Sequence, residues 1–76
     1  MTLWEIPPGG EAVVEAIACG GAAGDRLEDL GLRPGLRVRC LHVSPLGSPK
    51  AYAICGAAIA LREPDARGIL VREATP

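Results

Sequence analysis

The stretch LRVRCLHV, residues 36–43, decides the fold, because its side chains alternate between two faces. Leu36, Val38, Cys40 and His42 share one face of the predicted strand, and the intervening residues share the other. The first set begins with apolar side chains, so we expect it to face a hydrophobic core. The second half of the stretch is apolar on both faces, which predicts that this half of the strand is covered on both sides.

Outward from this strand, the chain divides into more short segments of the same kind. Turns rich in Gly and Pro separate four further predicted strands, residues 11–18, 50–55, 58–62 and 68–72. The alternation breaks near Glu15, which predicts a β-bulge there. Closing short strands into a barrel removes exposed edges and encloses the apolar stripes. The sequence therefore predicts an all-β fold, a small β-barrel of about five strands.

Two helical segments interrupt the predicted strands. Residues 25–30 read as a short helix inserted after the first strand, with Leu27 and Leu30 on one face. Gly31 is placed at the C′ position that follows this helix, where a left-handed backbone favours glycine. Residues 63–67 suit a single helical turn before the last strand, because a proline stands at its first turn.

The size and charge of the chain narrow the classes of function. With 76 residues, the chain is expected to form a single domain over residues 1–76. Apolar residues make up 49% of the chain, but twelve of them are Ala. The remaining large apolar side chains are enough for a thin core but not for a deep substrate pocket as well. Eight basic and nine acidic residues nearly cancel, so no field attracts a polyanion. We expect a binding module, not an enzyme.

The expected cellular location of the protein follows from the lack of a membrane-spanning segment and of a signal peptide in the sequence. No apolar run approaches the ~20 residues of a membrane span. Residues 1–8 have neither the basic end nor the apolar stretch of a signal peptide. Three Cys is an odd number, which favours reduced thiols over a disulfide framework. We therefore expect a cytoplasmic protein.

Two segments are candidates for binding a partner. The predicted helix could dock through Arg26 and one of its leucines, or both leucines could cap an open end of the barrel. The loop at residues 44–49 carries Pro45 and Pro49, which restrict the backbone and would pre-order a binding loop. Ordinary turn chemistry explains the same prolines.

Metal binding and nucleic-acid binding are weaker interpretations. Cys40 and His42 stand two apart on one strand, a workable ligand spacing to which Cys55 or a carboxylate could add a third donor. A closed zinc site needs about four ligands, and the chain has no Cys-x-x-Cys pair, so we assign no metal site. Arg33, Arg37 and Arg39 could mark an anion patch, but with only two aromatic residues the chain has no platform for stacking bases. A solvated strand face explains these arginines equally well.

Several short motifs follow one another within residues 3–71: RLxxLGLxPG at 26–35, PLGxP at 45–49, IALR at 59–62 and IxV at 69–71. In this order they resemble the FeoA family of small proteins of bacterial ferrous iron transport. Each motif is weak alone, but their order and spacing are specific. The chain departs from the family pattern at Ser48, where the family often has Asp, and in its three cysteines, Cys19, Cys40 and Cys55.

The resemblance implies an SH3-like barrel with a helical insertion after the first strand. It also implies a role in supporting a membrane-embedded ferrous iron transporter that has a cytoplasmic GTP-hydrolysing domain. We expect docking on that domain, without a cofactor or a nucleic-acid partner and with the membrane reached only through the transporter. Similar domains at the C-terminal end of iron-dependent repressors imply an alternative, a metal-sensing regulatory domain that would use Cys40, His42 and Cys55.

The expected partner-binding residues come from the helix and the loop. They are Arg26, Leu27, Leu30, Pro45, Leu46, Gly47 and Pro49. The edges of an incompletely closed barrel can also pair with one another, so a homo-oligomer stays open as an alternative.

Overall fold

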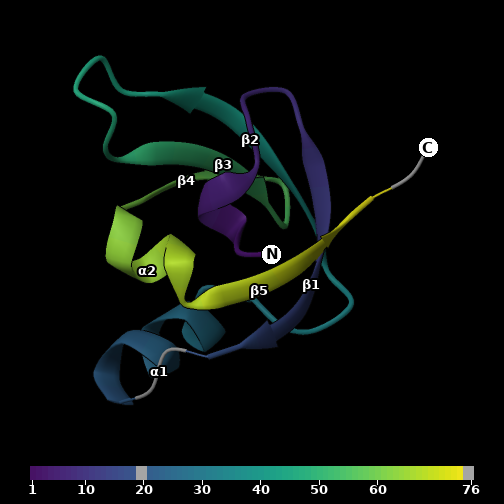
Figure 1. The fold of residues 1–76 in the computed structure, drawn as a ribbon. Helices are drawn as coiled ribbons and strands as arrows, with labels where there is room; N and C mark the ends of the chain where they lie inside the picture. Colours follow the sequence, from purple (N-terminus) through teal and green to yellow (C-terminus); the bar gives the residue numbers. More distant parts are fainter. Residues whose placement is uncertain (19–20, 75–76) are drawn as a thin grey trace.

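The computed structural model describes residues 1–18 and 21–74 of the chain, and Figure 1 shows their arrangement. Its elements in chain order are η1 (Leu3–Glu5), β1 (Glu11–Ile17), α1 (Gly21–Asp29), β2 (Arg37–Val43), β3 (Lys50–Ile54), β4 (Ala57–Leu61), α2 (Glu63–Arg67) and β5 (Ile69–Glu73). All strands that the sequence predicts are present, and α2 coincides with the predicted helical turn. Helix α1 begins at Gly21, four residues before the predicted start.

The five strands form one antiparallel sheet in the order β4-β3-β2-β1-β5. The sheet curls around its inner face, and η1 and α2 lie on the open side between β4 and β5 (Figure 1). The strands are five to seven residues long, and the right-handed twist that all strands share accumulates across the five of them into this curl. The predicted all-β barrel is therefore confirmed.

The core lies inside this curl and uses the apolar stripes of every strand. Val14, Val38, Ile54 and Val71 are each at most 2% exposed. Tyr52 on the central part of β3 is the largest fully buried side chain, and its hydroxyl donates a hydrogen bond of 3.3 Å to the Leu3 carbonyl oxygen. The core thus joins the middle of the sheet to the N-terminal segment.

Two irregularities in strand pairing decide which side chains face inward. The register between β1 and β5 shifts between Val14 and Ala16, which confirms the bulge predicted near Glu15. A second shift, between Cys40 and His42, interrupts the alternation of β2. Cys40 is fully buried, whereas His42 and the intervening Leu41 are exposed. The prediction that His42 shares the face of Cys40, and that this half of the strand is covered on both sides, was therefore wrong.

The N-terminal segment forms a plug that the sequence patterns do not reveal. η1 is a single 3-10 turn, with Leu3 fully buried and Ile6 3% exposed. Outside the core, the ammonium group of Lys50 lies 4.4 Å from the centre of the Trp4 ring. Lys50 also donates a hydrogen bond to the Trp4 carbonyl oxygen. Lys50 thus holds the N-terminal segment to β3 from outside the core, as Tyr52 does from inside it.

Helix α1 ends in a Schellman motif. The Leu32 amide donates to the Leu27 carbonyl oxygen at 3.1 Å, and the Gly31 amide donates to the Glu28 carbonyl oxygen at 2.9 Å. Gly31 has a φ of 97°, as predicted for the C′ position. Leu27 and Leu32 are buried together in the core, and this contact fixes the helix against the barrel.

We expect Gly31→Ala to lower the free energy of unfolding by about 1–2 kcal/mol, because an L side chain is strained in the left-handed region. Urea denaturation monitored by circular dichroism measures the loss. Gly35→Ala is the matched control: its φ of 89° imposes the same strain, but its added Cβ meets nothing within 4 Å. The Cβ at Gly31 lies 3.3 Å from the exposed Cys55 sulfur, which can swing away, so similar losses are expected. A Gly31→Ala variant as stable as the natural chain would contradict this account.

Candidate partner-binding site

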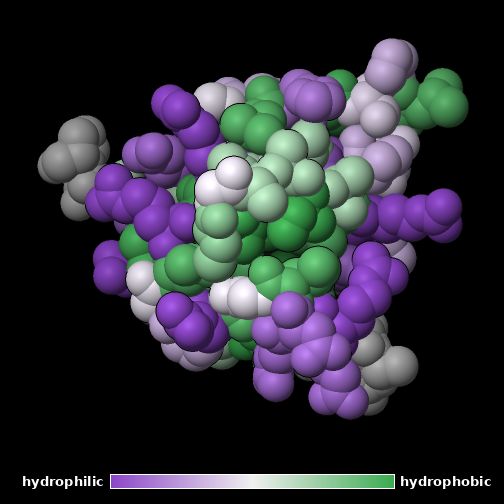
Figure 2. Space-filling view, turned by 180° about the vertical axis from the view of Figure 1, so that it is seen from behind, coloured by the Kyte–Doolittle hydropathy of each residue, from purple (hydrophilic) through white to green (hydrophobic). Residues whose placement is uncertain are grey.

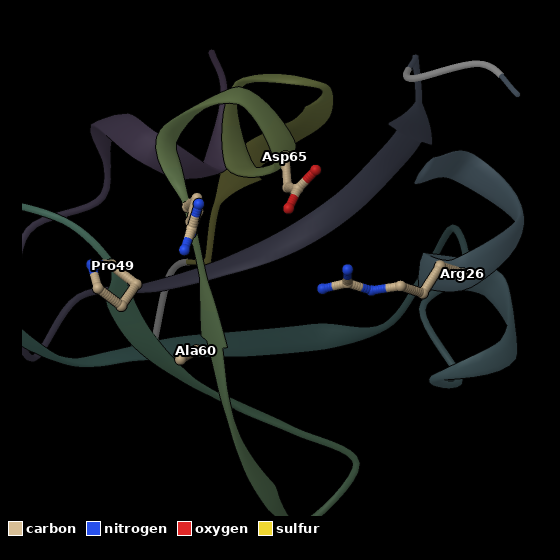
Figure 3. A pocket seen from close by; sticks show the side chains of 5 residues that line it. Arg26, Pro49, Ala60 and Asp65 are labelled. Atoms are coloured by element: carbon tan, nitrogen blue, oxygen red, sulfur yellow. The ribbon is translucent and has the colours of Figure 1, made fainter. Parts of the chain in front are cut away.

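A cavity of about 520 Å³ opens between α1, α2 and the end of β4. Its walls are Arg26 from α1, Pro49 from the loop before β3, Ala60 from β4, Arg62 and Asp65. Figure 3 shows the Arg26 side chain reaching across this space from α1, with the Asp65 carboxylate projecting from α2. The fold therefore brings together residues from four separate segments of the sequence.

The charge of the cavity is positive on balance. Arg26 and Arg62 are exposed, and neither forms an ion pair with any residue in the described ranges 1–18 and 21–74. Asp65 offsets one of the two charges, but it is itself engaged in another interaction. Arg67 on α2 is bound to Glu63 at 2.5 Å and contributes no free charge. Two guanidinium groups facing one space form a place for an anionic group.

The loop between β2 and β3 projects away from the barrel (Figure 1). Its turn is closed by a hydrogen bond of 2.8 Å from the Gly47 amide to the Ser44 carbonyl oxygen. Leu46 at this turn is 95% exposed, which no folding role explains. Pro49 at the base of the loop lies in the cavity, so the loop continues the cavity surface outward.

The structure places the predicted partner-binding residues in four different surroundings. Arg26 and Pro49 line the cavity together, and the exposed Pro45, Leu46 and Gly47 form the loop turn. Leu27 is 2% exposed and packs in the core, so its side chain supports α1 from beneath. Leu30 is 40% exposed beyond the end of α1, so the capping role considered for it belongs to Leu27 and Leu32.

Sequence reasoning did not place Ala60, Arg62 and Asp65 in a site. Ala60 and Arg62 belong to the motif IALR, which was noted only as a marker of the family. Arg62 directly follows the uncharged strand at residues 57–61, and this position is the sequence signal that could have found it.

An apolar patch of small side chains adjoins the cavity. Figure 2 shows it as a pale green area over β3 and β4, surrounded by hydrophilic residues. Ala57, Ala58 and Ala60 on β4 are exposed, and Ile59 between them is partly buried. Because Ala60 also lines the cavity, the patch and the cavity form one continuous surface.

The candidate metal ligands do not lie together. Cys40 is fully buried in the core, His42 is exposed beyond the bulge, and Cys55 is exposed at the β3–β4 turn. Within the described part of the chain, no three His, Cys, Asp or Glu side chains are close enough to hold a metal ion. Burial raises the pKa of the Cys40 thiol above its ordinary value, which disfavours the thiolate that a metal needs.

We expect the domain to lose stability in alkaline solution because of Cys40 and Tyr52. Burial raises the pKa of Tyr52 well above its ordinary value of 10.0, and an ionised Cys40 adds to the rise. The folded chain therefore keeps two protons that the unfolded chain releases above about pH 9 and pH 10. The contribution of Cys40 and Tyr52 to the free energy of unfolding is complete below pH 9. It is lost as the pH rises toward the pKa values that the two groups have in the folded chain.

Urea denaturation at a series of pH values from about 8 to 11 measures this loss. Tyr52→Phe is the control variant, since it removes the phenol and should flatten the part of the profile above about pH 10. A free energy of unfolding that stays constant from pH 8 to 11 in the natural chain would contradict the assignment.

The face that carries Arg33, Arg37 and Arg39 has a different character. All three are exposed, and Arg37 pairs with Glu11 at 3.7 Å. Such an exposed pair contributes about 0–1 kcal/mol, as expected for a solvated strand face. Neither aromatic ring is free to stack with a nucleic-acid base, because Tyr52 is buried and Lys50 covers the Trp4 ring.

The architecture identifies the class of protein. A curled sheet of five antiparallel strands, with one helix after the first strand and a helical turn before the last, is an SH3-like barrel. The pattern that defines FeoA domains matches residues 1–73, and the chain belongs to the FeoA family.

Solved structures of similar proteins agree with this assignment. The FeoA protein of Chlorobium tepidum is 35% identical, with a TM-score of 0.92 over 99% of this chain and 71% of its own. The FeoA of Stenotrophomonas maltophilia, solved with zinc and described as a prokaryotic SH3 domain protein, is 33% identical. Its TM-score is 0.85 over 95% of this chain and 89% of its own.

A manganese-dependent transcriptional repressor contains the same fold, with a TM-score of 0.86 at 23% identity over 97% of this chain and 41% of its own. At this identity the likeness concerns the fold alone. No curated protein matches the sequence. In the two described ranges of the chain, no helix combines the length and apolar character that crossing a bilayer requires.

Proposed function

We propose that this chain is a cytoplasmic accessory protein of bacterial ferrous iron uptake that docks on the GTP-hydrolysing domain of the membrane transporter. Membership of the FeoA family supports the iron-uptake role. The FeoA of Stenotrophomonas maltophilia is described as a candidate activating factor of ferrous iron transport, and we extend that role to this chain. GTP hydrolysis then belongs to the transporter, and this chain supplies a docking surface.

The observation that carries the proposal is the surface shared by the helix and the loop. Arg26 and Pro49, both expected from sequence to bind the partner, line one cavity although they lie far apart in the chain. The exposed Leu46 extends this surface, and an exposed leucine beside fixed charges is typical of a protein-binding site. The cavity is open and lined partly by charges, which suits a protein side chain better than a buried substrate.

Retention of the chain by the immobilised cytoplasmic domain of the transporter tests the proposal. We expect saturable binding in at least one of the nucleotide-free, GDP-bound and GTP-analogue-bound states. Arg26→Ala and Leu46→Ser should each weaken binding several-fold, because they remove a charge and an apolar contact from the surface. Arg39→Ala is the control, since Arg39 is exposed on the strand face outside the cavity. Absence of retention in all nucleotide states at low and moderate salt would overturn the proposal.

A further inference from the structure

The sheet has one free edge, and β4 forms it. In the order β4-β3-β2-β1-β5, β4 pairs only with β3 among the described residues. The other outer strand, β5, is covered by the N-terminal segment: Thr2 pairs with Leu70, and the Val71 amide donates to the Met1 carbonyl oxygen at 2.8 Å. Alternate backbone amide and carbonyl groups of β4 therefore point outward without a strand to receive them.

This edge has none of the features that normally prevent pairing. The strand sequence AAIAL at residues 57–61 contains no charge and no proline. Its five residue pairs with β3 follow one another without a bulge. Edge strands of stable proteins are usually protected by charges, prolines or bulges. An edge of this length without them, flanked by small alanine side chains, leaves room for another backbone to approach.

The charged cavity lies at the C-terminal end of the same edge. Ala60 of β4 is one of its walls, and Arg62 follows the strand directly. Arg26 reaches toward this end of β4 from α1 (Figure 3). A strand added to β4 would thus carry one of its side chains to two guanidinium groups, and a carboxylate is the side chain that complements them.

We propose that β4 accepts an extended segment of the partner protein as a sixth strand, with an acidic side chain of that segment held by Arg26 and Arg62. This inference rests on the proposed docking function and names the chemistry of its partner. Backbone hydrogen bonds along residues 57–61 supply the affinity, and the two arginines select a segment with a carboxylate at one position. The other residues of the segment are small or apolar, because they lie against the alanine patch.

A second copy of this chain fits the edge less well. Pairing of β4 with the β4 strand of another copy would satisfy the backbone groups, but residues 57–61 contain no carboxylate for the arginines. Glu63, the acidic residue nearest to the strand, is already paired with Arg67. Self-pairing therefore brings no carboxylate from the added strand to the two cavity arginines.

Fluorescence anisotropy with synthetic peptides tests the inference. The probe is a labelled, end-capped peptide of about seven residues in which valine and threonine alternate around one glutamate. We expect saturable binding at or below about millimolar concentration. Replacing the glutamate by glutamine should weaken binding about tenfold, since the charge-assisted bonds to the arginines are lost. Methylating alternate backbone nitrogens, which blocks strand pairing, should weaken it at least as much.

Variants of the chain complete the test. Arg26→Ala and Arg62→Ala should each reduce the preference for glutamate over glutamine, whereas Arg33→Ala, on another face, should leave it unchanged. Equal binding of the glutamate, glutamine and methylated peptides, or no binding at all, would overturn the inference. So would sedimentation equilibrium showing a dimer that the glutamate peptide does not dissociate.

The two proposals fail separately. Suppose that the transporter domain binds three samples equally well: the natural chain, the Arg62→Ala variant, and the natural chain with excess glutamate peptide. Docking then stands and the β4 inference fails. If the glutamate peptide binds as predicted but the transporter domain does not bind, the peptide site stands and the transporter is the wrong partner.

Discussion

Tyr52→Ala is expected to remove a large part of the stability of the fold. Tyr52 is fully buried at the middle of the sheet, and truncating a large buried aromatic side chain costs about 3–5 kcal/mol. A chain of 76 residues has roughly 4–11 kcal/mol of total stability at about 0.05–0.15 kcal/mol per residue. The loss therefore removes much or all of the stability, and circular dichroism with urea denaturation measures it.

Tyr52→Phe separates packing from the hydrogen bond. This variant keeps the ring and loses only the 3.3 Å hydrogen bond to the Leu3 carbonyl oxygen, so we expect a cost of about 1 kcal/mol. A cooperative unfolding transition for Tyr52→Ala at nearly the same urea concentration as the natural chain would show that the ring is not the centre of the core.

Leu3→Ala is expected to lower the free energy of unfolding by about 2–5 kcal/mol. The Leu3 side chain is fully buried, because it closes the open side of the barrel beside Tyr52. Its removal leaves a cavity between η1 and the other core side chains. Urea denaturation measures the loss, and tryptophan fluorescence follows the release of Trp4 from Lys50.

Leu46→Ala is the matched control for Leu3→Ala. It makes the same chemical change at a side chain that is 95% exposed, so its effect on stability should stay within about 0.5 kcal/mol. If Leu3→Ala is as mild as Leu46→Ala, the N-terminal segment is not part of the core, and the description of η1 as a plug is wrong.

The strands could be predicted because their apolar side chains recur at intervals of two. Val38 and Cys40 on β2, and Ile69 and Val71 on β5, all lie in the core as the alternation predicts. η1 could not be predicted in the same way, because residues 3–6 are too short to display a period. Its buried leucine and isoleucine become recognisable only when the open side of the barrel is known.

The capping alternative for Leu30 and the inward face predicted for His42 fail for the same reason. The spacing of Leu27 and Leu30 is correct for one helical face, but α1 ends at Asp29 and the chain then turns through Gly31. This turn directs Leu32 into the core in place of Leu30. At His42 the bulge in β2 breaks the alternation that the prediction assumed. Local pattern rules hold only until a cap or a bulge changes the direction of the chain.

The candidate site was predictable in its parts but not as a whole. Arg26 and the loop at residues 45–49 were expected from sequence, whereas Arg62 and Asp65 join them only through the packing of α1 and α2 around the end of β4. The free edge of β4 was hidden for a related reason. Free edges of an incompletely closed barrel were considered, but the sequence does not reveal that the N-terminal segment covers the β5 side and leaves β4 as the edge.

The docking surface is the central claim, and mapping it by nuclear magnetic resonance tests it most directly. The isotope-labelled chain is titrated with the unlabelled cytoplasmic domain of the ferrous iron transporter, and amide shift changes are placed on the structure. We predict saturable changes that cluster at Arg26, residues 45–49 and residues 57–62. Changes confined to the strand face of Arg33, Arg37 and Arg39, or no changes at saturating concentration, would contradict the account.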